Sequence, residues 1–249
     1  MDLKGLVVGI ANEHSIAWGC AKILHKEGAE LAITYQNEKA KDYVQPLAES
    51  VKAPIVMPLD VTDSGQLDAL FQTIQSTWGR LDFVIHSIAF APKSDLQGRV
   101  TDCSREGFIT AMDVSCHSLI RLAKAAEPLM TNGGNIITMS YYGSEKVVQN
   151  YNIMGPVKAA LEASVRYLAM ELGHKNIRVN ALSPGPVKTR AASGLVGFDA
   201  LIQKATSEAP LNQAVTIEEI GEAASFLISK TKSITGQIIY LDGGYNIKD

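Results

Sequence analysis

Tyr151 and Lys158 are the two residues whose types and spacing point most directly to chemistry, because a phenol and an ammonium lie seven residues apart near the start of a helical pattern. At about 100° per residue, both side chains fall within about 20° of each other on one helix face, separated by ~10.5 Å along the axis. A nearby ammonium favours the phenolate, so we expect the pKa of Tyr151 to be lowered towards neutral pH, which suits a proton donor. Taken alone, such a pair is more often a half-buried tyrosine and a solvated lysine, so the rest of the sequence must decide.

Pro156 lies between these two residues and restricts where the helix begins. Proline is comfortable only in the first turn of a helix, where its missing N–H costs little. A helix that begins near Asn152 keeps the shared face, whereas a start nearer Gly155 leaves Tyr151 on the entering loop and removes that face.

The composition is that of a protein with a sizeable core: 46% of the 249 residues are hydrophobic and 20% are charged, and we predict one α/β domain over residues 1–249. The net charge of −3, with Lys and Arg scattered, leaves no basic surface for nucleic acid. Cys20, Cys103 and Cys116 form no CxxC pair, so we expect a reducing, cytoplasmic location and no metal site. The sequence shows neither a signal-peptide pattern nor an apolar run near ~18 residues, so we expect neither export nor membrane insertion.

Short apolar runs alternate with longer helical patterns, which predicts a parallel sheet with helices between its strands. The helical patterns cover residues 15–27, 38–50, 64–78, 104–131, 152–173 and 217–229. Asp63 is placed to cap one helix start, and Gly79 and Gly173 mark helix ends. The seven expected strands are Leu6–Ile10, Leu31–Tyr35, Ile55–Leu59, Phe83–His86, Ile136–Met139, Val179–Leu182 and Ile238–Leu241.

The longest irregular stretch begins at Pro184 and runs to about residue 200, with glycines at 185, 194 and 197. A loop of this length inside a compact domain more often covers a site than fills space, so we expect a substrate-binding lid over residues 184–210. A mobile surface connection is the alternative.

The first expected strand leads through Gly9 to Ser15 and Gly19 at the start of the first helix. A glycine lets backbone approach a phosphate, and a helix N-terminus offers unpaired N–H groups, so this segment suits a pyrophosphate. The signal is weak by itself, because the GxGxxG spacing is missing and a plain strand-to-helix turn reads the same way.

Five motifs, spread from Leu6 to Asn246, together resemble those of bacterial NADH-dependent enoyl-acyl-carrier-protein reductases, a divergent branch of the short-chain dehydrogenase/reductase superfamily. They occur in the family's order, and they are Gly9-Ile-Ala-Asn-Glu-His-Ser-Ile-Ala-Trp-Gly19, His86-Ser-Ile-Ala-Phe-Ala-Pro92, Ser140-Tyr-Tyr-Gly143, Tyr151-Asn-Ile-Met-Gly-Pro-Val-Lys158-Ala-Ala-Leu-Glu-Ala163 and Ala191-Ala-Ser-Gly194. The resemblance implies a Rossmann-like, doubly wound seven-stranded parallel sheet of order 3-2-1-4-5-6-7. It also implies a homotetramer, an enoyl thioester on acyl carrier protein as substrate, and the last reductive step of each fatty-acid elongation cycle.

The spacing of the Tyr–Lys pair agrees with this assignment on physical grounds. A ketone reductase delivers hydride to the carbon that bears the oxygen, and the common superfamily pattern is Tyr-x3-Lys. In a 2-enoyl thioester, hydride goes to C3 while negative charge develops on the oxygen at C1, so the phenol must sit further away. Three added residues lengthen the separation by ~4.5 Å if all are helical, which has the right sign and rough size.

The resemblance implies a role for each residue of the reacting centre. Tyr151 hydrogen-bonds the thioester oxygen and stabilises the enolate, while Lys158 holds the nicotinamide ribose. Tyr141, at the end of the fifth strand, faces the substrate near C3; on sequence alone an exposed strand-end tyrosine fits almost as well. Because neighbouring side chains on a strand point to opposite faces, Tyr142 is expected to point away.

For the cofactor, the resemblance implies contacts at the pyrophosphate, the adenine, the ribose and nicotinamide, and the carboxamide. In that order these are Gly9, Ser15 and Ile16; Gln36, Asp60 and Val61; Ser87, Ile88 and Ala89; and Val187 and Thr189. The residues alone leave NADH and NADPH open, because the second strand ends without an acidic residue for the ribose or an arginine for a 2′-phosphate, and Lys39 lies nearby. The family favours NADH. Asp60 is equally suited to cap a turn before Thr62.

The acyl chain needs an apolar slot lined by small or flexible side chains. The candidates are Ala91, Tyr141, Tyr151, Met154, Ala191, Ala192 and Leu195. Arg190 stands where many relatives carry an apolar residue, and it suits either contact with the acidic carrier protein or plain solvation.

Two other functions are considered. A ketone- or alcohol-reducing short-chain dehydrogenase requires lysine four residues after the tyrosine, and Gly155 occupies that position. A non-catalytic dinucleotide-sensing regulator has no need of Tyr151 or Lys158, and both are present.

Overall fold

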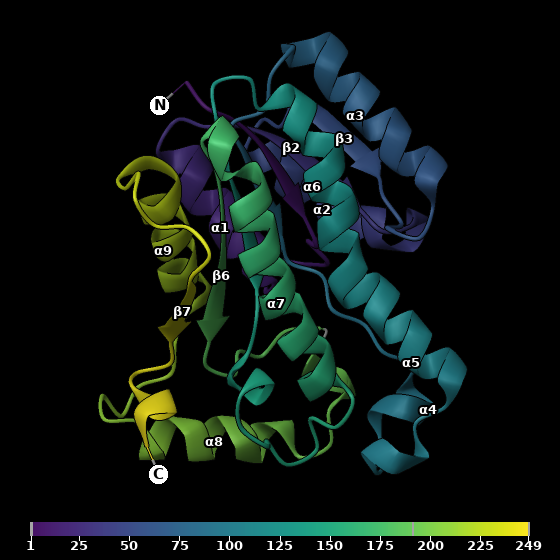
Figure 1. Cartoon of the computed structure of the whole chain (residues 1–249), viewed down its shortest axis with the longest axis vertical. Helices are drawn as coiled ribbons and strands as arrows, with labels where there is room; N and C mark the ends of the chain where they lie inside the picture. Colours follow the sequence, from purple (N-terminus) through teal and green to yellow (C-terminus); the bar gives the residue numbers. More distant parts are fainter. Residues whose placement is uncertain (1, 191, 249) are drawn as a thin grey trace.

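Seven parallel strands form one sheet in the order β3-β2-β1-β4-β5-β6-β7 (Figure 1). This computed structural model describes residues 2–190 and 192–248. The sheet reverses direction of growth between β1 and β4, so the order expected from the resemblance is confirmed. The strands are β1 (Lys4–Val8), β2 (Glu30–Tyr35), β3 (Ile55–Pro58), β4 (Phe83–His86), β5 (Gly134–Met139), β6 (Ile177–Pro184) and β7 (Ile238–Leu241).

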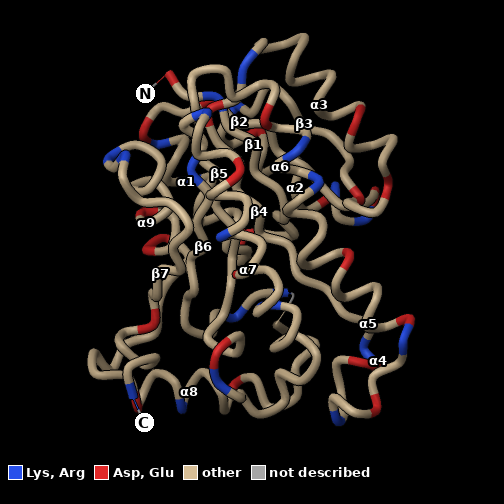
Figure 2. Tube along the Cα trace, in the orientation of Figure 1, with Lys and Arg blue, Asp and Glu red and all other residues tan. Residues whose placement is uncertain are grey.

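Helices cover both faces of the sheet, and the two cores show which helix packs where. One core joins the sheet to α1 (Ile16–Lys26), α2 (Glu38–Ser50) and α9 (Ile217–Ser229). The other joins it to α3 (Ser64–Trp78), α5 (Arg105–Met112), α6 (Ser118–Ala126) and α7 (Met154–Leu172). Charged residues of both signs are scattered over helices and loops (Figure 2).

The boundaries that the sequence marks with caps are confirmed. Asp63 accepts a hydrogen bond from the N–H of Gln66 at the start of α3, and Gly79 ends that helix in the left-handed conformation with φ 69°. Gly173 follows α7 in right-handed conformation, and the left-handed turn comes three residues later at Asn176, φ 58°.

The prediction of one continuous helix over residues 104–131 is wrong. α5 passes into a π-helical turn (Asp113–His117), then into α6 and a 3-10 turn (Glu127–Leu129). Inside the π-helical turn the Ser115 hydroxyl donates to the carbonyl of Phe90 at 2.9 Å and accepts from its N–H at 2.8 Å. The wider turn therefore places a hydroxyl against the loop after β4, which a regular helix pattern cannot reveal.

Three further expectations differ from the structure. The first strand runs over Lys4–Val8 and not to Ile10, because Gly9 leaves the strand at φ 108°. A short helix α4 (Lys93–Leu96) was not expected. Neither was α8 (Phe198–Glu208), which begins where the expected irregular stretch ends and forms the C-terminal part of the expected lid, residues 184–210.

Gly19 serves helix packing, although the sequence grouped it with the pyrophosphate segment. A Cβ on Gly19 would lie 2.1 Å from the carbonyl oxygen of Ile217, and a Cβ on Gly221 would lie 2.6 Å from the carbonyl oxygen of Gly19. α1 and α9 therefore cross with their backbones in contact, and this crossing fixes the end of α1 that faces the site.

Candidate active site

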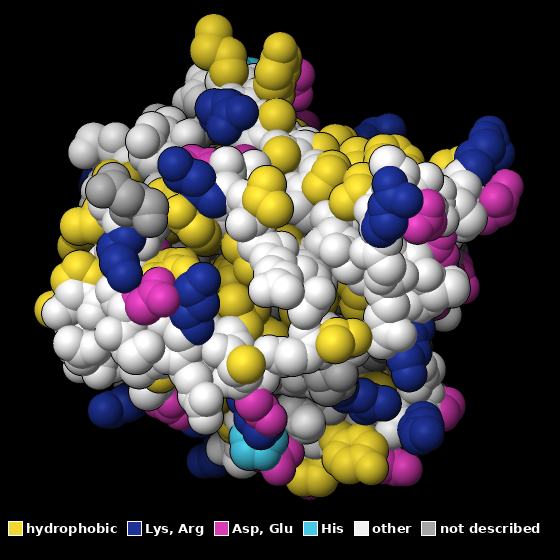
Figure 3. Space-filling view, turned by 90° about the horizontal axis from the view of Figure 1, so that it is seen from below, with side chains coloured by type: hydrophobic (Ala, Val, Ile, Leu, Met, Phe, Trp, Pro, Cys, Tyr) yellow, Lys and Arg dark blue, Asp and Glu magenta, His cyan; other side chains and the backbone are white. Residues whose placement is uncertain are grey.

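A cleft opens at the carboxyl ends of four adjacent strands. Gly9, Ser87, Ser140 and Gly185 directly follow β1, β4, β5 and β6, and all four line it. The cleft holds about 1070 Å³ of space between atoms, part of it open to solvent. Ligands of open parallel sheets bind at this edge, where the strand order reverses. Figure 3, viewed from that end of the molecule, shows a hollow with hydrophobic side chains in it and Lys and Arg side chains around it.

Tyr151 lies in the turn that enters α7, not on the helix itself. The helix begins at Met154, whose N–H donates to the Tyr151 carbonyl at 3.1 Å, and Pro156 sits in its first turn. The prediction of a shared helix face is therefore wrong, for the reason that the proline suggested. Tyr151 and Lys158 nevertheless line the same cleft.

The pKa of Tyr151 is raised, not lowered as the spacing suggested. The side chain is only 8% exposed, and burial disfavours the phenolate; Tyr141 and Glu162 act in the same direction. The phenol therefore keeps its proton and can donate a hydrogen bond at neutral pH.

Lys158 is buried on the first turns of α7, with its ammonium turned towards the end of β5. Its Nζ donates to the carbonyl oxygen of Met139 at 2.6 Å. Burial lowers the pKa of Lys158 to about 8, against the opposing attraction of Glu162. Lys158 therefore carries its charge at neutral pH and loses it just above.

Tyr141 enters the cleft, whereas Tyr142 turns to Tyr245. The rings of Tyr141 and Tyr151 meet edge to face with centroids 4.8 Å apart, and those of Tyr142 and Tyr245 with centroids 5.7 Å apart. Neighbouring side chains at the end of β5 thus point in different directions. Burial raises the pKa of Tyr141, so this phenol is also neutral.

The segment between β1 and α1 is folded tightly enough to present backbone to the cleft. A Cβ on Gly9 would lie 2.0 Å from the carbonyl oxygen of Ser87, so only glycine fits there. The Ser15 hydroxyl accepts from the N–H groups of Ala11 at 2.9 Å and Asn12 at 3.1 Å. Gly9, Ser15 and Ile16 all line the cleft, as do Ser87, Ile88, Ala89, Val187 and Thr189.

The three residues expected at the adenine lie elsewhere. Among the described residues, the lining of this cleft does not include Gln36, Asp60 or Val61. Asp60 caps a local turn, because its carboxylate accepts from the N–H and the hydroxyl of Thr62 at 2.9 and 2.7 Å. This is one of the two roles that the sequence left open, and it does not test the other.

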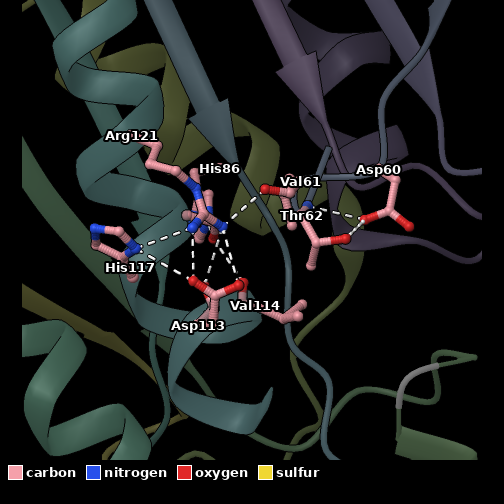
Figure 4. Close-up of polar contacts among 9 residues, drawn as sticks. Asp60, Val61, Thr62, His86, Asp113, Val114, His117 and Arg121 are labelled. Atoms are coloured by element: carbon pink, nitrogen blue, oxygen red, sulfur yellow. Dashed lines mark hydrogen bonds and ion pairs between the residues drawn. The ribbon is translucent and has the colours of Figure 1, made fainter. Parts of the chain in front are cut away.

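Arg121, on α6, links the loop of Asp60 and Val61 to the π-helical turn (Figure 4). Its guanidinium donates to the Val61 carbonyl at 2.7 Å and to the Asp113 carboxylate at 2.6 Å. It also lies 2.9 Å from Nδ1 of His117. Sequence reasoning missed Arg121, because it lies far from Val61 in the chain and matches no motif.

The walls of the cleft near Tyr151 are apolar. Of the residues that the sequence offered for an acyl slot, Ala91, Met154, Ala192 and Leu195 line this cleft, while Ala191 lies outside the described residues. Apolar residues that the sequence did not single out complete the walls, namely Phe90, Leu96, Met139, Phe198 and Leu201. The last two lie three residues apart on α8, and that spacing was the available signal for an amphipathic helix facing the site.

Comparison with known proteins places the whole chain beside one group of enzymes. The family model described as "Enoyl-(Acyl carrier protein) reductase" matches residues 9–246. The chain is 49% identical over 245 residues to enoyl-acyl-carrier-protein reductase (NADH) FabI of Rickettsia typhi, covering 98% of this chain and 94% of that protein. It is 50% identical over 254 residues to the corresponding protein of Synechocystis, covering 99% and 98%.

Solved structures agree with the sequence relatives. The enoyl-acyl-carrier-protein reductase of Anaplasma phagocytophilum in complex with NAD has a TM-score of 0.95 at 47% identity, with 99% of this chain and 94% of that chain covered. The Bacillus cereus enoyl-acyl carrier protein reductase with NADP+ and indole naphthyridinone has a TM-score of 0.97 at 43% identity, with both chains fully covered.

Proposed function

The chain belongs to the enoyl-(acyl carrier protein) reductase family, and from that membership we propose which of its residues carry out the reaction. It is an NADH-dependent enoyl-acyl-carrier-protein reductase of fatty-acid elongation. The observation that carries the assignment of residues is that Tyr151 and Lys158 are both buried, and both line the one cleft at the carboxyl ends of β1, β4, β5 and β6.

The residues that follow the carboxyl end of β1 are suited to bind a dinucleotide. Gly9 permits backbone to pass where any Cβ would collide, and the start of α1 lines the same cleft. We assign Gly9, Ser15 and Ile16 to the pyrophosphate. Ser87, Ile88 and Ala89 are assigned to the ribose and nicotinamide, and Val187 and Thr189 to the carboxamide.

Tyr151 is the group assigned to the developing charge. NADH supplies the hydride that C3 of the trans-2-enoyl thioester accepts. Negative charge then develops on the thioester oxygen, and C2 takes a proton from solvent to complete the saturated product. Tyr151 keeps its own proton because burial raises the pKa of its phenol, so it donates a hydrogen bond to that oxygen and stabilises the enolate.

Lys158 and Tyr141 are assigned to positioning at the reacting centre. Lys158, charged at neutral pH and held by the Met139 carbonyl, donates to the nicotinamide ribose. Tyr141 packs its ring against Tyr151 and faces the substrate near C3. Gln36, Asp60 and Val61 are assigned to the adenine end, beyond the cleft, where Arg121 holds the loop.

Residues 184–210 are proposed as the substrate lid. Ala192, Leu195, Phe198 and Leu201 line the cleft with apolar side chains, which suits an acyl chain, and Ala91 and Met154 belong to the same lining. Ala191 completes this proposed set. Lys188, paired with Asp199 at 3.0 Å, and Arg190 lie on the lid, where cations suit an acidic carrier protein.

A homotetramer is proposed, with the outer surfaces of α5, α6 and α7 as the contact region. These helices expose apolar side chains that a monomer leaves in water, namely Phe108, Ile109, Ile120, Tyr167 and Met170. Within residues 2–190 and 192–248, no helix is long and apolar enough to cross a membrane. The thiols of Cys20, Cys103 and Cys116 are free, which supports the proposal of a reducing cytoplasm. We also propose that residues 1–249 fold as one catalytic domain.

Turnover with two thioesters tests the function directly. Protein, NADH and crotonyl-CoA are mixed and the absorbance of the reduced cofactor is followed, with acetoacetyl-CoA in parallel. Consumption of NADH with crotonyl-CoA but not with acetoacetyl-CoA supports the enoyl reductase. Consumption of NADH with acetoacetyl-CoA but not with crotonyl-CoA supports the ketone reductase. NADH binding without turnover of either selects the dinucleotide sensor, and the same assay with NADPH measures nucleotide preference.

A further inference from the structure

Glu162 is a buried acidic residue next to the reacting centre, and no step described so far uses it. It lies on α7, only 5% exposed, four residues beyond Lys158. Four residues correspond to about 6 Å along a helix axis, so the two side chains belong to neighbouring turns of one face. An acidic side chain buried this deeply needs polar partners or a counter-charge.

Two serines from one short segment supply polar partners. The Ser144 hydroxyl donates to Oε1 of Glu162 at 2.6 Å, and the Ser140 hydroxyl donates to the same oxygen. Ser140 directly follows Met139, whose carbonyl accepts from Lys158. The end of β5 thus fixes both side chains, the ammonium through one backbone carbonyl and the carboxylate through the next residue's hydroxyl.

We propose that Glu162 is a positioning residue for the active-site lysine: its carboxylate, held by Ser140 and Ser144, is the counter-charge that keeps Lys158 an ammonium directed at the bound nucleotide. This inference rests on the proposed role of Lys158 in holding the nicotinamide ribose. Glu162 itself touches neither substrate nor cofactor in this scheme.

The electrostatic surroundings of Lys158 support this role. Burial is the main influence on the pKa of Lys158 and lowers it; Glu162 is the largest opposing influence, ahead of Cys116. The titratable groups that interact electrostatically with Lys158 or Glu162 come from several elements: Cys116 from the π-helical turn, His86 from β4, Tyr151 from the turn before α7, and Tyr240 from β7. Burial keeps His86, Tyr151 and Tyr240 neutral near pH 7.

The test is a titration of Lys158 in the full-length protein. Lysine labelled with 13C at Cε reports the charge of each ammonium by NMR, and the resonance of Lys158 is identified by its absence in Lys158→Met. In the wild type we expect the Lys158 resonance to titrate near pH 8. In Glu162→Gln we expect that midpoint to fall by at least about one pH unit.

NADH affinity, followed by fluorescence across the same pH range, gives the functional readout. The alkaline loss of affinity is expected to begin at lower pH in Glu162→Gln, by the same shift. Glu162→Asp keeps the charge and is expected to restore the wild-type midpoint to within about half a unit. Glu171→Gln, an exposed change on the same helix, is the matched control and is expected to leave the midpoint in place.

A merely structural role predicts something different. In that case Glu162→Gln weakens NADH binding equally at every pH, with the Lys158 midpoint unchanged, and the proposal is overturned. If Glu162→Gln does not fold, Ser144→Ala takes its place, since loosening the carboxylate is expected to move the midpoint in the same direction by a smaller amount. An unmoved midpoint in Ser144→Ala then overturns the proposal. Wild-type protein that binds no NADH at any pH contradicts the proposed function instead, and the NMR titration still reports on Glu162.

Discussion

The ring of Tyr151 meets the ring of Tyr141 edge to face, at a centroid separation of 4.8 Å and an interplanar angle of 67°. This contact holds the Tyr151 phenol in place even though the residue lies in a turn ahead of α7. A Cβ on Gly143 would lie 2.4 Å from the Tyr151 ring and 3.3 Å from the Tyr141 ring, so the loop after β5 packs against both rings. Packing from the β5 end therefore positions the phenol, in place of the helix that the spacing suggested.

Tyr151→Phe keeps the ring and removes only the hydroxyl. Loss of one preorganised donor to a developing oxyanion costs about 3 kcal/mol, so kcat with crotonyl-CoA is expected to fall by 10²- to 10³-fold. NADH affinity is expected to stay within about twofold, because the hydroxyl is assigned to the thioester and not to the nucleotide. Stopped-flow turnover and a fluorescence titration with NADH measure the two effects, and an equal loss in both contradicts the assignment.

Lys158→Met is expected to have two effects: weaker NADH binding and a more stable fold. The folded pKa of Lys158 is lowered to about 8 from 10.5, so the unfolded chain binds the proton more tightly. Below pH 8 this costs stability, by about 3 kcal/mol, and the cost vanishes as the pH rises to 10.5. Methionine removes the cost but leaves the Met139 carbonyl without its donor, for a net gain of about 1–2 kcal/mol.

Urea unfolding of the wild type and Lys158→Met at pH 7 and pH 10 checks the sign. The advantage of the variant should shrink at the higher pH, where most of the penalty on wild-type Lys158 is gone. The prediction is contradicted if Lys158→Met is less stable than the wild type at pH 7, or if its NADH affinity is unchanged. Either result would mean that Lys158 is not a destabilising residue retained for nucleotide binding.

Much of the fold follows from local signals, and the exceptions share one cause. Asp63 and Gly79 mark the ends of α3 because caps act within a few residues. The break between α5 and α6 and the contact of Gly19 with α9 depend on partners distant in sequence, namely Phe90 and Ile217. For the site, motif residues predicted the cleft lining near Tyr151, but the raised pKa of its phenol comes from burial, which spacing does not report.

Arg121→Ala is expected to weaken NADH binding without changing the KM for crotonyl-CoA. The guanidinium joins the Val61 carbonyl to Asp113, so its loss frees the loop assigned to the adenine. One charge-assisted hydrogen bond corresponds to a loss of about tenfold in NADH affinity. Isothermal titration with NADH measures it, and Arg166→Ala, an exposed change on α7, is the control. A rise in KM for the thioester with unaltered nucleotide affinity excludes this role.

His86 makes the fold sensitive to acid. It is fully buried, and its ring nitrogens pair with the hydroxyls of Thr138 at 2.7 Å and Ser118 at 2.8 Å. Burial, aided by Lys158, lowers the pKa of His86 from 6.5 to about 3. The unfolded chain therefore takes up a proton at higher pH than the folded one, and the stability present above pH 6.5 is lost as the pH falls towards 3.

Between pH 7 and pH 5 this linkage removes about 2 kcal/mol from the free energy of unfolding. His86→Gln offers an amide to the same hydroxyls and does not titrate, so its unfolding free energy is expected to fall by about 2 kcal/mol less over that interval. His14→Gln, an exposed change, controls for loss of a histidine as such. Urea unfolding at both pH values measures the slopes; parallel slopes for wild type and His86→Gln show that the buried imidazole is not the acid-sensitive group.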